Sequence, residues 1–147
     1  MTNYEEYLKF NEEKHAKLQN ELLKEININA DYTDKIKSIN TKKHLLIFAE
    51  PFCPDCRILV SIVERIRKLN QVSIDVEYLS IKDNIFKLNM MSKEGKIPCV
   101  FLVDGLKVTK ILEEYPNDFN ATDELREDYR QGKYNDLIIS TIVNALL

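Results

Sequence analysis

Blocks of apolar and polar positions along the chain predict a mixed α/β fold. The continuous apolar run Leu45–Ala49 predicts a strand that is buried on both faces. The alternating segment Val72–Leu79 predicts a second strand, and the apolar run Val100–Val103 predicts a third. Asp104-Gly105 is typical of a tight turn, so we expect Leu106–Leu112 to pair antiparallel with the strand before it.

Helical periodicity occupies the intervals between these strands. From Pro54 to about Leu69, apolar residues recur at three-to-four spacing, which predicts an amphipathic helix with Cys56 on its inner face. Lys82–Ser92 predicts a shorter helix, and Gly95 suits its exit. Because strand, helix and strand follow one another, we expect the first two strands to pair in parallel.

Both ends of the chain are predicted to be helical. Residues 3–28 place apolar side chains on one broad face, and a second helix is expected over Asp31–Ile39, capped at its first residue or at Thr33. We interpret residues 1–40 as a helical extension and residues 41–147 as the domain. The extension either packs on this domain or serves as a partner-binding or dimerising arm. Near the C-terminus, we expect Thr122 to cap a short helix and Gly132 to end it. Asn135 is expected to cap the last helix.

Composition and charge narrow the functional classes. The 147 residues suggest one domain, and a net charge of −3 gives no sign of nucleic-acid binding. No apolar run approaches the roughly 18 residues of a membrane span, and the N-terminus is too polar for a secretory signal. Three cysteines do not make a disulfide framework. We therefore expect a cytoplasmic protein whose paired thiols serve catalysis or metal binding.

The cysteine pair Cys53 and Cys56 lies between a buried strand and an amphipathic helix, which favours a dithiol redox site. At the N-cap, Cys53 would face unpaired N–H groups and the positive end of the helix dipole, which stabilise a thiolate. Pro54 suits the first helical position. Asp55 also suits a first turn, but its charge disfavours a neighbouring thiolate, so we expect Asp55→Ala to lower the pKa of Cys53.

Structural zinc is the alternative use of the pair. Zinc commonly takes four ligands, and only Cys99, His15 and His44 remain to complete a set with Cys53 and Cys56. Neither histidine has ligand spacing to the pair. We therefore expect no metal, and we interpret His44, which precedes the first strand, as a surface residue.

In element order, the chain from Lys42 to Leu147 resembles the thioredoxin family, on the residues Phe48–Cys56 and Gly95–Pro98. The resemblance implies a thioredoxin fold, in which a central mixed β-sheet is flanked by helices. It implies a cis bond before Pro98, facing the two sulfurs, and a backbone at Ile97 that binds the substrate chain.

The sequence departs from the family pattern at the active site. Phe52 replaces the usual tryptophan and, with Pro54, is expected to border the substrate, while Pro51 has no counterpart in thioredoxins. Leu46 aligns with the acid that thioredoxins bury below the cysteines. The missing acid implies a differently tuned release step or a substitute such as Glu50, which is otherwise a surface residue.

Cys99 follows Pro98, where thioredoxins typically have threonine. It is either a buried core cysteine or a third functional thiol, acting as a regulatory disulfide partner or as a metal or cluster ligand with the pair. A glutaredoxin-like interpretation is a further alternative, but Val108–Ile111 stands where glutaredoxins usually carry Gly-Gly.

Together these features predict a thiol–disulfide oxidoreductase without a cofactor. Cys53 would attack a protein disulfide and Cys56 would resolve the mixed disulfide. Asp55, Glu50 and Cys99 are candidate accessory residues. The resemblance implies that electrons come from a thioredoxin reductase or another dithiol donor, with no nucleic-acid or membrane partner. The non-enzymatic alternative is a thioredoxin-fold module that binds a metal, a cluster or a partner protein.

Overall fold

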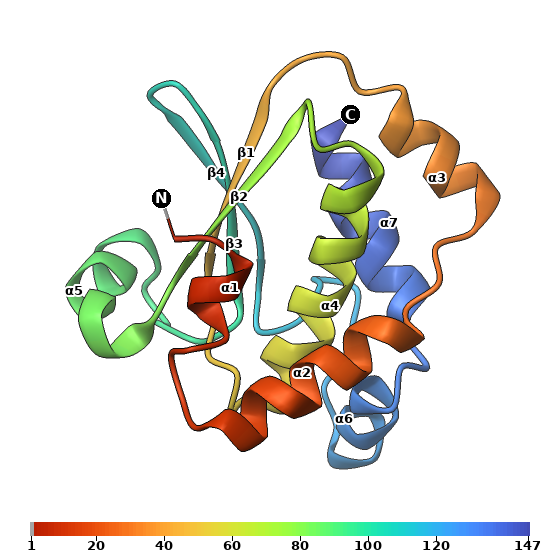
Figure 1. Cartoon of the computed structure of the whole chain (residues 1–147). Coiled ribbons are helices and arrows are strands. Elements are labelled where there is room, and N and C mark those ends of the chain that lie inside the picture. The colour runs from red at the N-terminus through yellow and green to blue at the C-terminus, as the bar shows by residue number, and fades with distance from the viewer. Residues whose placement is uncertain (1) are drawn as a thin grey trace.

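The computed structural model describes residues 2–147 (Figure 1). Within this part of the chain, no helix has the length and apolar character needed to cross a membrane. In chain order the elements are α1 (Tyr4–Tyr7), α2 (Glu13–Glu25), α3 (Ala30–Lys37), β1 (Lys43–Phe48), α4 (Pro54–Leu69), β2 (Ile74–Leu79), α5 (Ile81–Met91), β3 (Cys99–Asp104), β4 (Lys107–Glu113), α6 (Asp123–Arg130) and α7 (Asn135–Leu146).

The strands form one mixed sheet in the order β2-β1-β3-β4. β1 pairs in parallel with β2 and antiparallel with β3, and β3 pairs antiparallel with β4. The predicted βαβ unit and hairpin are therefore confirmed. In the β1–β3 register Phe48 lies opposite Cys99, so the loop that follows Phe48 and the loop that ends at Pro98 meet at one end of the sheet.

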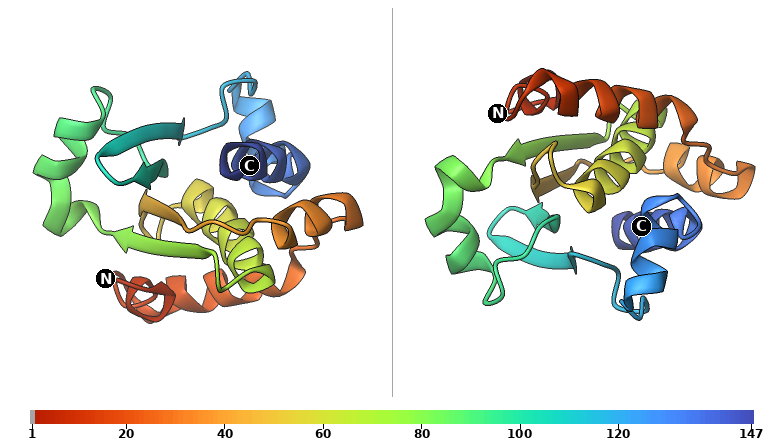
Figure 2. Two further views of the ribbon diagram at one scale, coloured as in Figure 1. Left: turned by 90° about the horizontal axis from the view of Figure 1, so that it is seen from above. Right: turned by 90° about the horizontal axis from the view of Figure 1, so that it is seen from below.

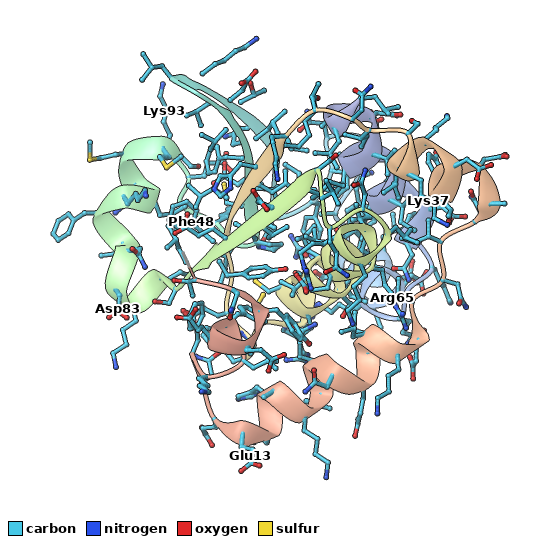
Figure 3. The ribbon with its side chains drawn as sticks, turned by 45° about the horizontal axis from the view of Figure 1, so that its top comes forward. Glu13, Lys37, Phe48, Arg65, Asp83 and Lys93 are labelled. Carbon is cyan, nitrogen blue, oxygen red and sulfur yellow. The ribbon has the colours of Figure 1, made fainter. Side chains whose placement is uncertain are left out.

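The sheet separates two apolar clusters. The larger one packs Leu45 and Ile47 of β1, and Ala49 just after it, against α4, α7 and the N-terminal helices. The smaller one, which includes Leu46 and Phe48, lies on the opposite face under α5 (Figures 1 and 3). Successive strand residues point to opposite faces, so this alternation decides which side chains can reach the cysteine pair.

The N-terminal segment is broken where the sequence predicted one long helix over residues 3–28. Asn3 and Glu6 form a capping box on α1, which ends after a single turn, and α2 begins anew at Glu13. The break lets Tyr7 be fully buried while the polar residues after it turn away from the core. The cap of α3 is Asn29, one residue before Ala30, and so neither Asp31 nor Thr33 as predicted. Asn29 is the cap because its side chain accepts a hydrogen bond from the Tyr32 N–H, in the first turn of the helix.

The C-terminal helices largely follow the prediction. Thr122 caps α6 by accepting from the Leu125 N–H at 3.3 Å, and Gly132 follows the helix with a φ of +90°. The cap of α7 is Tyr134, whose carbonyl accepts from the Ile138 N–H, so Asn135 is the first helical residue instead of the predicted cap.

Candidate active site

Cys53 is the N-cap of α4, as the sequence predicted. Its sulfur accepts a hydrogen bond from the Cys56 backbone N–H at 3.3 Å, and its own N–H donates to the Glu50 carbonyl at 3.1 Å. Cys53 is partly exposed, whereas Cys56, one turn later, is fully buried. The helix start therefore presents one sulfur to solvent and places the other behind it.

The surroundings move the pKa values of the two thiols in opposite directions. A hydrogen bond from the Cys56 side chain lowers the pKa of Cys53, together with backbone hydrogen bonds at the helix start and against the opposing effects of burial and of Asp55. Burial raises the pKa of Cys56 well above its ordinary value, and the bond to Cys53 adds to this rise. At neutral pH, the accessible sulfur is thus the one favoured as a thiolate.

Asp55 is buried, with only 4% of its surface exposed, and it is held by two residues that sequence reasoning missed. Tyr115 Oη donates to its Oδ2 at 2.8 Å, and Arg130 Nε donates to its Oδ1 at 3.1 Å. Burial raises the pKa of Tyr115 to about 12, and the hydrogen bond to Asp55 and its charge add to the rise. The carboxylate charge beside the thiols is therefore partly neutralised by the guanidinium.

An aromatic cluster covers the Asp55 side of the site. Neighbouring rings of Tyr115, Phe119, Tyr129 and Tyr134 have centroids 4.8 to 6.4 Å apart. Burial, with smaller effects of Asp55, Tyr115 and Cys56, raises the pKa of the fully buried Tyr129. These residues follow β4 as scattered aromatics without helical or strand periodicity, so no local pattern indicated their role.

On another side, the N-terminal segment holds the loop before Cys53. Asn11 Oδ1 accepts from the Phe52 N–H at 2.9 Å, and Asn11 Nδ2 donates to Glu50 Oε2 at 2.9 Å. Glu50 Oε1 accepts from the Ile81 N–H at 3.0 Å. Only 3% of Glu50 is exposed, so its interpretation as a surface residue is wrong, and both carboxylate oxygens are bonded to groups other than the cysteines.

A buried polar chain links α1, α2 and α4 behind the cysteines. Tyr7 Oη donates to Gln19 Oε1 at 2.8 Å, and Gln19 Nε2 donates to Ser61 Oγ at 2.8 Å and to the Arg57 carbonyl at 3.0 Å. Burial is the main cause that raises the pKa of Tyr7, and the nearby charges of Cys56 and Cys53 add to it. The N-terminal helices are therefore part of the surroundings of the site.

The loop before β3 is fixed from β4. The Ile97–Pro98 peptide bond is cis, and the Pro98 carbonyl accepts from the Glu114 N–H at 2.7 Å. The Glu113 carboxylate accepts from Ser92 Oγ and, at 3.0 Å, from the Lys96 N–H. Through the β1–β3 register, this loop lies at the same end of the sheet as the loop before Cys53.

Cys99 and Leu46 lie on the far face of the sheet from Cys56, in the cluster under α5. Burial raises the pKa of Cys99 to about 12, and Glu113 adds to the rise. The structure does not bring Cys99 together with the pair. Among residues 2–147, no three or more His, Cys, Asp or Glu side chains are grouped to hold a metal ion. Leu45 and Ile47 of β1, and Ala49 just after it, share the cluster that contains Cys56, whereas Leu46 is in the other cluster and so is not the residue below the cysteines.

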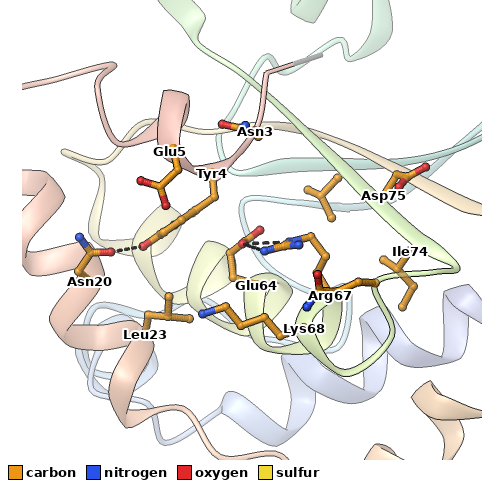
Figure 4. A pocket seen from close by; sticks show the side chains of 12 residues that line it. Asn3, Tyr4, Glu5, Asn20, Leu23, Glu64, Arg67, Lys68, Ile74 and Asp75 are labelled. Atoms are coloured by element: carbon orange, nitrogen blue, oxygen red, sulfur yellow. Dashed lines mark hydrogen bonds and ion pairs between the residues drawn. The ribbon is translucent and has the colours of Figure 1, made fainter.

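A buried acid is nevertheless present on α4. Glu64 is fully buried and accepts hydrogen bonds from Tyr78 Oη at 2.6 Å and from Arg67 at 2.9 and 3.1 Å. It lies at a pocket of about 450 Å³ between α1, α2, α4 and β2, where Tyr4 Oη also donates to Asn20 (Figure 4). Because its hydrogen bonds come from Tyr78 on β2 and from Arg67 on α4, Glu64 ties β2 to α4.

His44 lies at the other end of β1 from the cysteines. Its Nε2 is 3.6 Å from Glu77 Oε1 on the neighbouring strand, and its side chain is 29% exposed. His44 therefore lies at the end of the sheet opposite the cysteines, as predicted, but it is half-buried within β1 and not a surface residue that precedes the strand.

The fold and the site together define a class of protein: an α/β domain whose exposed N-cap cysteine and buried second cysteine begin a helix at one end of a mixed sheet. The chain belongs to the thioredoxin family, because the family model described as Thioredoxin matches residues 1–129. The match begins at residue 1 and so includes the N-terminal helices. The division into residues 1–40 and 41–147 stays a prediction.

Solved structures share this fold at low sequence identity. A Pseudomonas aeruginosa protein of unknown function is 16% identical, with a TM-score of 0.83 over 99% of this chain and 90% of that chain. An HIV epitope-scaffold is 15% identical, with a TM-score of 0.80 over 99% and 91% of the two chains. The Enterococcus faecalis alkylhydroperoxide reductase AhpF is 17% identical, with a TM-score of 0.55 over 90% of this chain and 53% of that chain. No curated protein matches the sequence.

Proposed function

We propose that the protein is a thiol–disulfide oxidoreductase that reduces disulfides in other proteins. The observation that carries the proposal is the contrast between the two thiols at the start of α4, where the partly exposed Cys53 has a lowered pKa and Cys56 is buried within one turn of it. An attacking thiolate with a resolving thiol behind it is the arrangement that dithiol exchange requires.

The exchange proceeds in two substitutions at sulfur. The Cys53 thiolate attacks one sulfur of the substrate disulfide, forming a mixed disulfide and releasing the other substrate sulfur as a thiolate, which takes up a proton. Cys56 then loses its proton and attacks Cys53, which releases the second substrate thiol and leaves a Cys53–Cys56 disulfide. Two electrons pass from the protein to the substrate, and a dithiol donor, such as a thioredoxin reductase, must return them.

Four residues are proposed to border the substrate chain. Phe52 is 50% exposed and Pro54 is exposed, next to Cys53 on either side. Ile97 and Pro98 lie in the loop at the same end of the sheet. An odd number of cysteines without a disulfide framework fits work in a reducing cytoplasm.

Insulin-disulfide reduction by the wild type and by Cys53→Ser tests this proposal. We expect the wild type to be active and the variant to be inactive, because serine cannot form the mixed disulfide. We expect Cys56→Ser to accumulate that mixed disulfide, which mass spectrometry detects. A Cys53→Ser variant as active as the wild type would overturn the proposal.

A further inference from the structure

A groove between α2 and α6 reaches the first turn of α4, where Pro54 and Arg57 border it. Figure 2 shows the arrangement of the helices from above and from below. Its volume is about 440 Å³. Pro54 follows Cys53 directly in the sequence, so the groove opens beside the exposed sulfur. A polypeptide joined to Cys53 in a mixed disulfide has this groove within reach of its flanking residues.

The α2 wall of the groove is one helical stripe. Leu18, Glu21, Leu22 and Glu25 follow the i, i+3, i+4, i+7 spacing that aligns side chains on one face. Leu18 is 46% exposed although it is apolar. The main core contacts of α2 are made by the buried Gln19 and Leu23, and Leu22 is partly buried against the same core. Leu18, Glu21 and Glu25 are exposed, so these side chains are free to contact a ligand.

The uncompensated charge in the groove is negative. Arg130 is paired with Asp55, whereas Arg57 donates to the neutral Pro51 carbonyl at 2.8 Å and keeps its charge. The carboxylates of Glu21, Glu25 and Glu127 outweigh this one remaining cation. Glu21 and Glu25 are exposed, and within residues 2–147 neither makes an ion pair or a side-chain hydrogen bond. Apolar side chains next to unpaired carboxylates fit a ligand that carries an apolar group and a cationic group.

Building on the proposed exchange activity, we propose that this groove selects disulfide substrates whose cysteine is followed or preceded by an apolar and a basic side chain. The apolar side chain contacts Leu18 and Leu22, and the Lys or Arg pairs with Glu21 or Glu25. The stripe rises about 10 Å along α2, which matches roughly three residues of an extended chain. Both determinants therefore lie within a few residues of the substrate cysteine.

Three disulfide-linked peptides that differ only in these flanking positions test the proposal: one with Leu and Lys, one with Leu and Glu, and one with Ser and Lys. The rate constant for reduction by pre-reduced protein is measured under single-turnover conditions. We expect the Leu–Lys peptide to react fastest, with a preference for Lys over Glu of about two- to five-fold for each ion pair formed. High salt should reduce that preference.

Matched charge reversals locate the effect. Glu21→Lys and Glu25→Lys should each diminish the preference for Lys over Glu. Asp34→Lys makes the same charge change on an exposed position of α3, outside the groove, and should retain the preference. Equal rates for all three peptides, or an equal loss of preference in Asp34→Lys, would overturn the groove proposal.

A small uncharged disulfide, bis(2-hydroxyethyl) disulfide, separates this proposal from the exchange activity. If the wild type reduces it but does not discriminate among the peptides, the groove proposal fails and the exchange activity stands. If the wild type reduces neither the small disulfide nor any peptide, both proposals are overturned.

Discussion

At the scale of single residues, Asp55 is a charged neighbour whose pairing modifies the tuning of the cysteine pair. The Cys56 hydrogen bond lowers the pKa of Cys53 and burial raises that of Cys56, while the Asp55 carboxylate opposes the first shift and adds to the second. The carboxylate is itself held by Arg130 at 3.1 Å and by Tyr115 at 2.8 Å. Asp55 lies in the first turn of α4, where its negative charge stabilises the helix and disfavours a thiolate at Cys53. The partners come from segments 60 and 75 positions away in the chain, so no local pattern could indicate them.

We expect Asp55→Asn to lower the pKa of Cys53. The substitution removes the negative charge that opposes the thiolate, and it frees the Arg130 guanidinium, which also favours a thiolate. Arg130→Gln is the matched control and should raise the pKa, because it leaves the Asp55 charge uncompensated. The pH dependence of Cys53 alkylation by iodoacetamide measures both shifts, and an unchanged or higher pKa in Asp55→Asn would contradict this account.

At the scale of elements, the N-terminal segment supports the site through hydrogen bonds to α4 and to the loop before Cys53. Asn11, in the connection between α1 and α2, bonds to both Phe52 and Glu50 in the loop before Cys53. Gln19 of α2 bonds to Ser61 and Arg57 of α4. The core shared by these helices and α4 explains how a segment interpreted as an extension comes to hold the loop before Cys53.

We expect Asn11→Ala to destabilise the protein by about 1 to 2 kcal/mol, because it removes hydrogen bonds to a backbone N–H and to a buried carboxylate. The rate of Cys53 alkylation at fixed pH should change as the loop loses this support. Urea unfolding monitors stability, and Asn40→Ala, at an exposed position, is the control. Equal stability and equal alkylation rates in Asn11→Ala and the control would refute the role of Asn11.

Elements with strong local signals were predictable from the sequence. The apolar run of β1, the Asp104-Gly105 turn and the periodicity up to Leu69 all encode their structure within a few residues. The Cys53–Cys56 site and the position of Pro98 were likewise predictable, because short sequence motifs indicate them. The break after α1 was missed because Asn11, in the connection that follows, bonds to a loop about 40 positions away, and helical periodicity does not indicate such a contact.

At the scale of the whole molecule, the interior contains cysteine thiols and tyrosine phenols that are buried in their neutral form. Burial raises the pKa values of Cys56, Tyr7 and Tyr78 well above their ordinary values, and those of Cys99 and Tyr129 as well. These groups ionise far more easily in the unfolded chain. Alkaline pH therefore favours unfolding.

We expect the reduced protein to lose stability as the pH rises above about 9, where thiols and then phenols of an unfolded chain ionise. Each such group lowers the unfolding free energy by up to about 1.4 kcal/mol per pH unit. Cys53, whose pKa is lowered, acts in the opposite direction, but it is one group against five. Urea unfolding at pH 7 and pH 10 with a reductant present measures the change, and equal or greater stability at pH 10 would be inconsistent with it.

The central claim, that Cys53 and Cys56 form the redox couple, is tested most directly by equilibrating the protein in dithiol–disulfide buffers of graded potential. Differential alkylation and mass spectrometry then report the state of each cysteine. We predict one two-electron transition in which Cys53 and Cys56 become linked, while Cys99, on the far face of the sheet, stays reduced. A pair that never forms a disulfide, or a disulfide that includes Cys99, would contradict the account.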